Sequence, residues 1–261
     1  MSERLSAVMA MVPECRKLAD IGCDHAYVSI RLVEDGVAES SLASDVREGP
    51  LVHARKNVAD AGLADKIEIR KFPGAEGIKP GEVDCILISG MGGRLTEEIL
   101  KTSAEVIKAS DTLVLEPQSD MFLVRQCIRD LGFCITDEDF VIDSGKYYQV
   151  ICAIKRDKVE NREKIERLSA RFAKALEAVR GLGFADSEII RACDKYGPVL
   201  LSEENELMRE FLLERKEHFK GILSDEAFVN SPLPQSKQRL SFVKKEAADV
   251  NAALGFYRQE V

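Results

Sequence analysis

The chain has 261 residues, enough for one large domain or two modest domains with buried cores. Its residues are 45% hydrophobic and 31% charged, a balance that excludes collagen-like and mucin-like chains and does not favour disorder. Lysine and arginine number 37 against 45 acidic residues, so the net charge of −8 argues mildly against a nucleic-acid partner.

Cysteine usage and hydropathy indicate the compartment. The seven cysteines are odd in number and never occur at C-x-x-C spacing, which fits neither a disulfide framework nor a zinc site. The apolar stretch at residues 7–12 is too short for a signal peptide, and no run approaches the roughly 20 apolar residues that cross a bilayer. We therefore expect a cytoplasmic protein that binds no metal and no membrane.

Short apolar runs alternate with helix-like stretches from Lys17 to about Ile154, a pattern typical of βα units that form a mainly parallel sheet. Strands are predicted at residues 18–22, 41–45, 66–71, 83–89, 112–115 and 147–154. Helices are predicted at residues 28–35, 50–61, 96–108 and 122–131. This order predicts a doubly wound α/β sheet, which binds ligands beyond the carboxyl ends of its strands.

After Ile154 the chain becomes charged and helix-forming. The longest periodic stretches, at residues 203–223 and 236–257, predict two helices that turn back on each other as an antiparallel, coiled-coil-like hairpin. We therefore predict two domains, a sheet domain at residues 1–154 and a helical domain at residues 155–261.

Charge is divided unevenly between these domains. Residues 1–154 carry 17 basic and 26 acidic side chains, whereas residues 155–261 carry 20 and 19. The segment 155–180 holds nine basic against five acidic residues, typical of a solvated helix with i,i+4 ion pairs. It also fits a stripe that faces phosphates, in which Arg162, Arg167 and Arg171 would bind nucleic acid.

Acidic side chains follow two successive predicted strands. Asp20 and Asp24 surround Gly22 at the first strand end, and Asp45 ends the second. The G-x-G-x-x-G fingerprint of dinucleotide-binding proteins is missing, because no further glycine follows Gly22 there. Without a phosphate-binding turn, the acids suit a cationic, hydroxyl-bearing ligand such as S-adenosylmethionine, with Asp45 on its ribose.

The fourth predicted strand runs into a second glycine-rich turn. Gly90, Gly92 and Gly93 surround Met91 where the chain passes from strand to helix. A tight turn alone seldom needs so much glycine, so we expect backbone groups of this turn to approach something flat or bulky.

The D-I-G-C-D-H-A-Y string at residues 20–27, Asp45, and the G-M-G-G turn at residues 90–93 together resemble a known family. They are similar to bacterial tRNA (adenine-N1)-methyltransferases that modify position 22 of certain tRNAs. The resemblance covers the sheet domain closely and extends loosely over residues 197–223. It implies a Rossmann-like class I methyltransferase fold that uses S-adenosyl-L-methionine, and a helical domain that holds tRNA.

The resemblance also implies roles for individual residues. Asp20, Gly22 and Asp24 would lie around the methionine moiety of the cofactor, Gly90 would also contact the cofactor, and Met91 would lie near the reacting atoms. We assign Asp24 to stabilising the cationic product ring, with His25 either orienting Asp24 or contacting the base. We expect Tyr27 or Phe72 to stack on the unstacked target adenine.

Two segments depart from the family pattern. Residues 72–75 read F-P-G-A where members usually show G-D-G-L, so Pro73 replaces an aspartate that meets the cofactor adenine. We expect either the backbone of Gly74 and Ala75 or the Glu76 side chain to take over that contact. Residues 116–118 read E-P-Q instead of Q-P-N, which we interpret as altered charge near the substrate mouth.

Three functional interpretations remain. The first is a monomeric tRNA adenine N1-methyltransferase. The second is a non-catalytic scaffold that binds cofactor or RNA, suggested by Pro73 and Glu116. The third, favoured only by the acidic pI, is a methyltransferase that acts on a protein or a small molecule.

Overall fold

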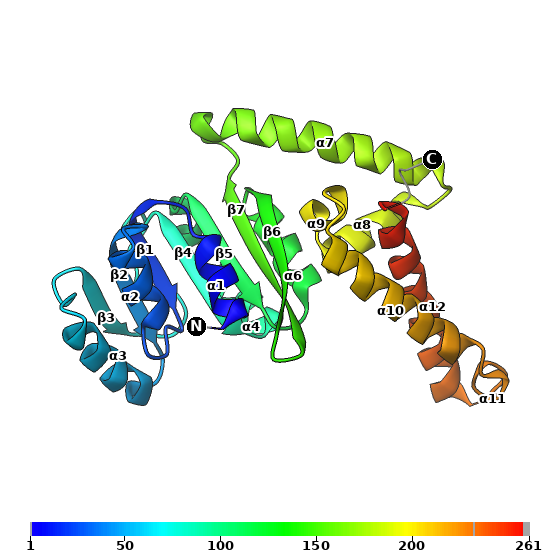
Figure 1. The fold of residues 1–261 in the computed structure, drawn as a ribbon, viewed down its shortest axis with the longest axis horizontal. Helices are drawn as coiled ribbons and strands as arrows, with labels where there is room; N and C mark the ends of the chain where they lie inside the picture. Colours follow the sequence, from blue (N-terminus) through cyan, green and yellow to red (C-terminus); the bar gives the residue numbers. More distant parts are fainter. Residues whose placement is uncertain (1, 232, 258–261) are drawn as a thin grey trace. The chain divides into compact units, whose positions relative to one another are not determined.

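A computed structural model describes residues 2–231 and 233–257 and divides the chain into units 1–165 and 166–261 (Figure 1). The predicted boundary at residues 154 and 155 falls earlier. Two ion pairs hold the connecting segment to the first unit, because Lys158 Nζ lies 2.6 Å from Asp111 Oδ2 and Lys164 Nζ lies 2.8 Å from Asp137 Oδ2.

The first unit contains the doubly wound sheet that the sequence predicts. Its strands are β1 (Cys15–Ile21), β2 (Ala38–Asp45), β3 (Ile67–Lys71), β4 (Cys85–Met91), β5 (Thr112–Pro117), β6 (Phe133–Asp143) and β7 (Lys146–Lys155). They lie in the order β3-β2-β1-β4-β5-β7-β6, and β7 runs antiparallel to both of its neighbours. The order reverses between β1 and β4, and such a switch point opens a crevice at the carboxyl ends of the strands.

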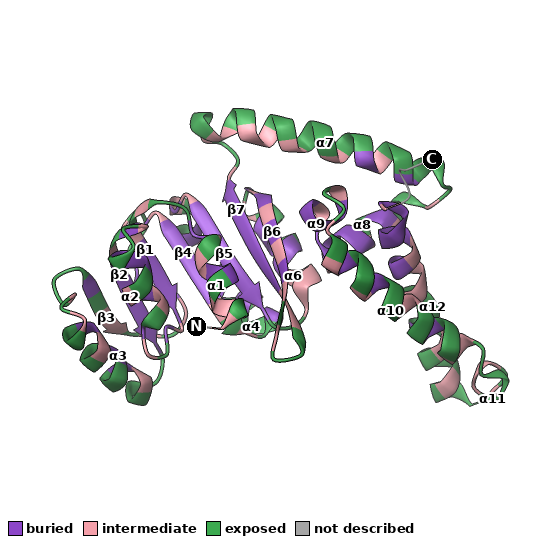
Figure 2. Ribbon diagram, viewed as in Figure 1, coloured by how far each residue is buried: buried purple, intermediate pink, exposed green. Residues whose placement is uncertain are grey.

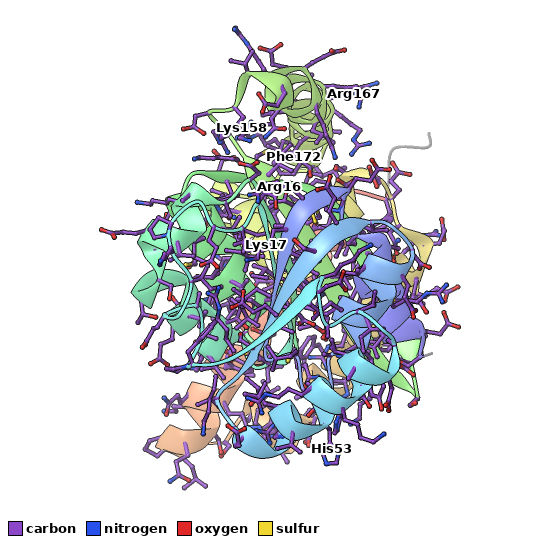
Figure 3. All side chains as sticks on the ribbon, turned by 90° about the vertical axis from the view of Figure 1, so that its left-hand side faces the viewer. Arg16, Lys17, His53, Lys158, Arg167 and Phe172 are labelled. Carbon is purple, nitrogen blue, oxygen red and sulfur yellow. The ribbon has the colours of Figure 1, made fainter. Side chains whose placement is uncertain are left out.

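Helices cover both faces of the sheet (Figure 1). They are α1 (Glu3–Ala10), α2 (Tyr27–Glu34), α3 (Glu48–Asp60), α4 (Gly93–Thr102), α5 (Ala104–Ala109) and α6 (Met121–Asp130). The central strands are therefore buried on both sides, as Figure 2 shows, and Leu113, Val114 and Leu115 of β5 are fully enclosed.

In the first unit the structure adds two elements to those predicted and divides a third. α1 precedes the first strand, with the Ser2 hydroxyl accepting a hydrogen bond from the Leu5 backbone N–H as its N-cap. β6 pairs with β7 along most of its length. The helix predicted at residues 96–108 is broken at buried Ser103, whose φ of −106° and ψ of 28° separate α4 from α5.

The helical unit follows the connecting turn η1 (Val159–Asn161). Its helices are α7 (Arg162–Gly181), which begins in the first unit, α8 (Asp186–Tyr196), α9 (Pro198–Ser202), α10 (Glu206–Leu223), α11 (Glu226–Val229) and α12 (Pro234–Gly255). α10 and α12 pack against each other as the predicted hairpin, and α8 packs on α12. No helix in the described ranges is long and apolar enough to cross a membrane.

Candidate functional site

A cleft of about 690 Å³ opens at the carboxyl ends of β1, β2 and β4. This volume is in the range that holds a cofactor-sized ligand. Of the residues predicted from the sequence, those that line it are Asp20, Gly22, Asp24, His25, Tyr27, Asp45, Gly74, Gly90 and Met91. Ala75 is buried behind the lining, and Arg162, Arg167 and Arg171 lie on α7, outside it.

Asp20 is the most deeply buried carboxylate of the cleft. The Ser29 hydroxyl donates a 2.7 Å hydrogen bond to Asp20 Oδ2, and the Ser41 hydroxyl donates in turn to Ser29 Oγ at 3.0 Å. In the described ranges no side chain donates a hydrogen bond to Asp20 Oδ1. Burial raises the pKa of Asp20 to about 6, although the Ser29 bonds oppose the rise. A cationic group beside Oδ1 would offset this burial cost.

Gly22 lines the cleft at a point where the backbone lies close to the Met91 side chain. Its φ of 76° lies in the left-handed region that favours glycine, and a Cβ added there would lie 2.2 Å from the Met91 Cε atom. Gly22 is therefore in direct contact with the G-M-G-G turn, and the Met91 side chain crosses the glycine. A larger residue at position 22 would displace Met91.

Asp45 ends β2 on the neighbouring wall. Its Oδ1 accepts a 2.8 Å hydrogen bond from the Arg47 backbone N–H, while the Arg47 side chain is exposed. No hydrogen bond to Asp45 Oδ2 occurs in the part of the chain that the structure describes. A buried carboxylate held from one side can accept hydroxyl groups from the other.

Rings gather at the mouth of the cleft. The His25 ring lies between those of Tyr27 and His53, with centroid distances of 5.8 and 5.1 Å, and Tyr27 is 58% exposed. His25 Nε2 lies 3.6 Å from Asp24 Oδ2, too far for a hydrogen bond. Of the two roles expected for His25, this geometry favours contact with a base over orientation of Asp24.

The segment that departs from the family pattern forms another part of the lining. Phe72, Pro73, Gly74 and Glu76 all face the cleft. Gly74 has a φ of 52°, and a Cβ added there would lie 3.1 Å from an Ile99 side-chain carbon. The loop therefore presents the Phe72 ring, the Gly74 backbone and the exposed Glu76 carboxylate to the cleft. Pro73 lines the cleft beside them.

The G-M-G-G turn is held close to the chain's own backbone. A Cβ on Gly93 would lie 2.1 Å from the Ser119 carbonyl oxygen and 2.9 Å from that of Asp120. The Gly93 backbone N–H donates to Ser119 Oγ at 3.3 Å. We expected the backbone of this turn to approach something flat or bulky. At Gly93 the group that it approaches is the backbone of the segment before α6.

The buried carboxylate of Glu116 fixes the start of this turn, and its cationic partner was not among the residues predicted from the sequence. Glu116 Oε2 accepts hydrogen bonds from Arg4 Nη1 at 2.8 Å, Ser89 Oγ at 2.9 Å and the Gly90 backbone N–H at 2.8 Å. The Glu116 side chain is fully buried, so our interpretation of altered charge at the substrate mouth is wrong. Arg4 lines the cleft and neutralises the carboxylate inside the protein.

We expect Arg4→Met to lower the free energy of unfolding by about 2 kcal/mol, because it leaves the Glu116 carboxylate buried without its cation. Adding Glu116→Gln should return at least half of the loss, since the amide oxygen keeps the acceptor but not the charge. Urea unfolding measures both effects. The control is Arg31→Met, which breaks an exposed pair with Asp35 and should change stability by less than about 0.5 kcal/mol. Equal effects of Arg4→Met and Arg31→Met would contradict the assignment.

The arginines predicted to face phosphates do not form a uniform stripe. Arg171 Nη2 lies 2.5 Å from Glu203 Oε1, so its charge is already paired, whereas Arg167 is exposed without an ion pair in the described ranges. Arg162 is exposed at the start of α7. The solvated-helix interpretation thus fits Arg171 best.

Comparisons with known proteins identify the family of the chain. Residues 1–151 match the model of a family described as a methyltransferase domain. The chain is 28% identical to the tRNA (adenine(22)-N(1))-methyltransferase of Bacillus subtilis (strain 168), over 95% of this chain and 93% of that protein.

Solved structures extend the similarity over the whole fold. The crystal structure of the B. subtilis m1A22 tRNA methyltransferase superimposes with a TM-score of 0.77 at 27% identity, covering 97% of this chain and 98% of that one. A Streptococcus pneumoniae protein in complex with S-adenosyl-L-methionine gives 0.73 at 26%, covering 97% and 99%. The chain therefore belongs to the methyltransferase domain family.

Proposed function

We propose that the protein is a tRNA (adenine-N1)-methyltransferase that takes its methyl group from S-adenosyl-L-methionine and modifies adenine 22. The observation that carries the proposal is the pair of buried carboxylates at successive strand ends, Asp20 and Asp45, which share one cleft with the G-M-G-G turn. Full-length similarity to a B. subtilis protein named for this activity supports it. We infer a cytoplasmic monomer.

The donor set of the cleft fits the cofactor, which supplies an activated methyl group when bound. Asp20 Oδ1 would accept its ammonium group, and Asp45 Oδ2 its ribose hydroxyls. Gly22 and Gly90 allow backbone to approach it. Gly74 and the exposed carboxylate of Glu76 are available to its adenine.

The remaining groups suit an adenine that attacks through N1. This atom already has an in-plane lone pair, so the enzyme must mainly align it and needs no base to remove a proton first. Tyr27 is exposed enough to stack on the ring, and His25 lies beside it. The Asp24 side chain, 62% exposed at the mouth, would stabilise the positive charge that develops on the ring.

We expect Asp24→Ala to lower kcat by about 10- to 100-fold, because it removes one electrostatic contact to the charged product ring. The dissociation constant for S-adenosyl-L-methionine should change less than threefold, since Asp20 and Asp45 remain. Single-turnover kinetics and calorimetry separate the two quantities. Equal losses in turnover and in cofactor affinity would refute the assignment.

The proposed reaction is tested with purified protein, S-adenosyl-L-methionine and an unmodified bacterial tRNA transcript. Nucleoside mass spectrometry should find 1-methyladenosine in the product, and a transcript with guanine at position 22 should remain unmodified. Cofactor binding without methylation of any transcript would favour the scaffold interpretation. Methylation of a protein, with tRNA unchanged, would favour the third one.

A further inference from the structure

One helix of the second unit carries an uninterrupted set of positive charges. Residues 234–245 of α12 include four basic and no acidic side chains, and all four are exposed: Lys237, Arg239, Lys244 and Lys245.

Most of these side chains share one face. Lys237, Ser241, Lys244 and Lys245 stand at positions i, i+4, i+7 and i+8, which lie along one side of a helix. Val243, by contrast, is buried on the side of α12 that packs in the helical unit. The lysines span about 12 Å along the axis at roughly 1.5 Å per residue. We call Lys237, Lys244 and Lys245 the α12 lysine row.

The α12 lysine row has no counter-charge, unlike several other cations of its unit. Arg180 pairs with Asp186 at 2.7 Å, and Lys220 pairs with Glu217 at 3.3 Å. None of the three lysines has an ion pair in residues 2–231 and 233–257.

Acidic neighbours on the same helix are occupied elsewhere. Glu246 Oε1 lies 2.5 Å from Lys195 Nζ of α8, and buried Asp249 contacts both Lys195 and Arg191 at 2.6 and 2.8 Å. The α8 cations therefore hold the carboxylates that follow the lysine row, which leaves the charge of the row uncompensated.

An aromatic side chain flanks the row. Phe242 is 61% exposed, although an apolar ring of this size usually gains from burial. A basic groove or row combined with an exposed ring is the combination that binds the backbone and an unstacked base of a nucleic acid.

We propose that the α12 lysine row and Phe242 form a contact surface for the RNA substrate, with the lysines on phosphates and the ring against an unpaired base. The assignment rests on the proposed function, because that function makes RNA the polyanion at hand. It places the main electrostatic contact of the helical unit on α12 and not on the α7 arginines, of which Arg171 is already paired. An anionic membrane is the competing partner, but the buried side of this helix packs inside the protein and leaves no broad apolar face for lipid.

The test compares two triple variants that lose the same charge. Lys237→Gln/Lys244→Gln/Lys245→Gln removes the row, whereas Lys101→Gln/Arg209→Gln/Lys220→Gln removes three cations that are paired with Glu97, Glu206 and Glu217. Binding of an unmodified tRNA transcript is measured by fluorescence anisotropy at several KCl concentrations. We expect the row variant to bind at least 10-fold more weakly, with the slope of log affinity against log salt reduced by about 2, and the control to change less than threefold. Equal changes in both variants, or an unchanged salt slope, would overturn the assignment.

Two further arms complete the test. Phe242→Ala should weaken tRNA binding without changing the salt slope. The α7 variant Arg162→Gln/Arg167→Gln/Arg171→Gln is measured in the same way. If it lost tRNA binding while the row variant bound tRNA fully, the proposal would be overturned in favour of α7. Vesicles of phosphatidylglycerol serve as the membrane probe, and a row variant that loses vesicle binding but keeps tRNA binding would also overturn it. Because tRNA binding is read without methyl transfer, a protein that binds tRNA through the row but methylates nothing would contradict only the proposed function.

Discussion

Asp20→Ala is expected to weaken binding of S-adenosyl-L-methionine by at least about 100-fold, since loss of a buried charged hydrogen bond costs about 3 kcal/mol. The carboxylate is buried, is held by Ser29 through Oδ2, and has Oδ1 available for an ammonium group. Calorimetry measures the dissociation constant. Asp20→Asn keeps the shape but not the charge and should recover only part of the affinity. Cofactor binding by Asp20→Ala within threefold of the unaltered protein would contradict the assignment.

The raised pKa of Asp20 adds a pH dependence to this result. Burial places the pKa at about 6, so the group is protonated in the free protein below that pH. A cationic ligand binds the ionised form, and its affinity should therefore fall by up to about 10-fold per pH unit below 6.

Stability of the free protein depends on pH in the opposite sense. The folded pKa of Asp20 lies above the unfolded value of 3.8, so the folded state binds this proton more tightly. The corresponding contribution to the free energy of unfolding, about 3 kcal/mol, is complete below pH 3.8 and is lost as the pH rises through 6.

The affinity for the cofactor tests the role of Asp20 as the ammonium ligand. A dissociation constant for S-adenosyl-L-methionine that is independent of pH between 5 and 8 would contradict this role.

Arg125→Met is expected to produce the largest loss of stability, about 3–5 kcal/mol, because it leaves a carboxylate buried without its cation. Arg125 Nε donates a 2.8 Å hydrogen bond to Glu138 Oε1, and Nη2 donates a 2.6 Å bond to Gln149 Oε1. The side chains of both Arg125 and Glu138 are fully buried. Such a loss is a large part of the 5–15 kcal/mol that holds a typical domain folded.

A second variant separates charge from packing. Adding Glu138→Gln to Arg125→Met removes the unpaired charge and should recover about half of the lost free energy of unfolding. Denaturant unfolding of the sheet unit within the whole chain measures both variants. If Arg125→Met cost less than 1 kcal/mol, the clamp between α6 and the β6–β7 ribbon would not contribute as the structure indicates.

The same buried pair explains which strand could not be predicted. The central strands follow from apolar runs because they are buried on both faces, whereas the edge strand β3 follows from the alternation of residues 66–71. β6 contains Asp137, Glu138 and Asp139 in succession, a pattern that does not indicate a strand. Glu138 is buried there only because Arg125 reaches it from α6, and such a tertiary contact leaves no trace in the local sequence.

The site residues that can be predicted from the sequence are those that belong to a short motif within a single segment of the chain. Asp20, Gly22 and Gly90 lie at strand ends within short, glycine-containing strings, and the structure places them in one cleft. Arg4 precedes Glu116 by more than a hundred residues, so only the fold shows that they meet. Ser2, which caps α1, was the one available sign that a helix carries Arg4.

The net charge of −8 also takes on a different meaning. The deficit belongs to residues 1–154, where Asp20 and Asp45 are buried at the cleft, and not to residues 155–261. Part of the negative charge is therefore buried and does not lie on the surface that a polyanion would contact. The α12 lysine row shows how a local surface can differ in sign from the whole.

Methylation of adenine 22 is tested in cells that lack this gene. Nucleoside mass spectrometry of their purified tRNA should show that 1-methyladenosine at position 22 is lost. The unaltered gene should restore it, and the Asp20→Ala gene should not. Unchanged 1-methyladenosine at position 22 in the deletion strain would contradict the account.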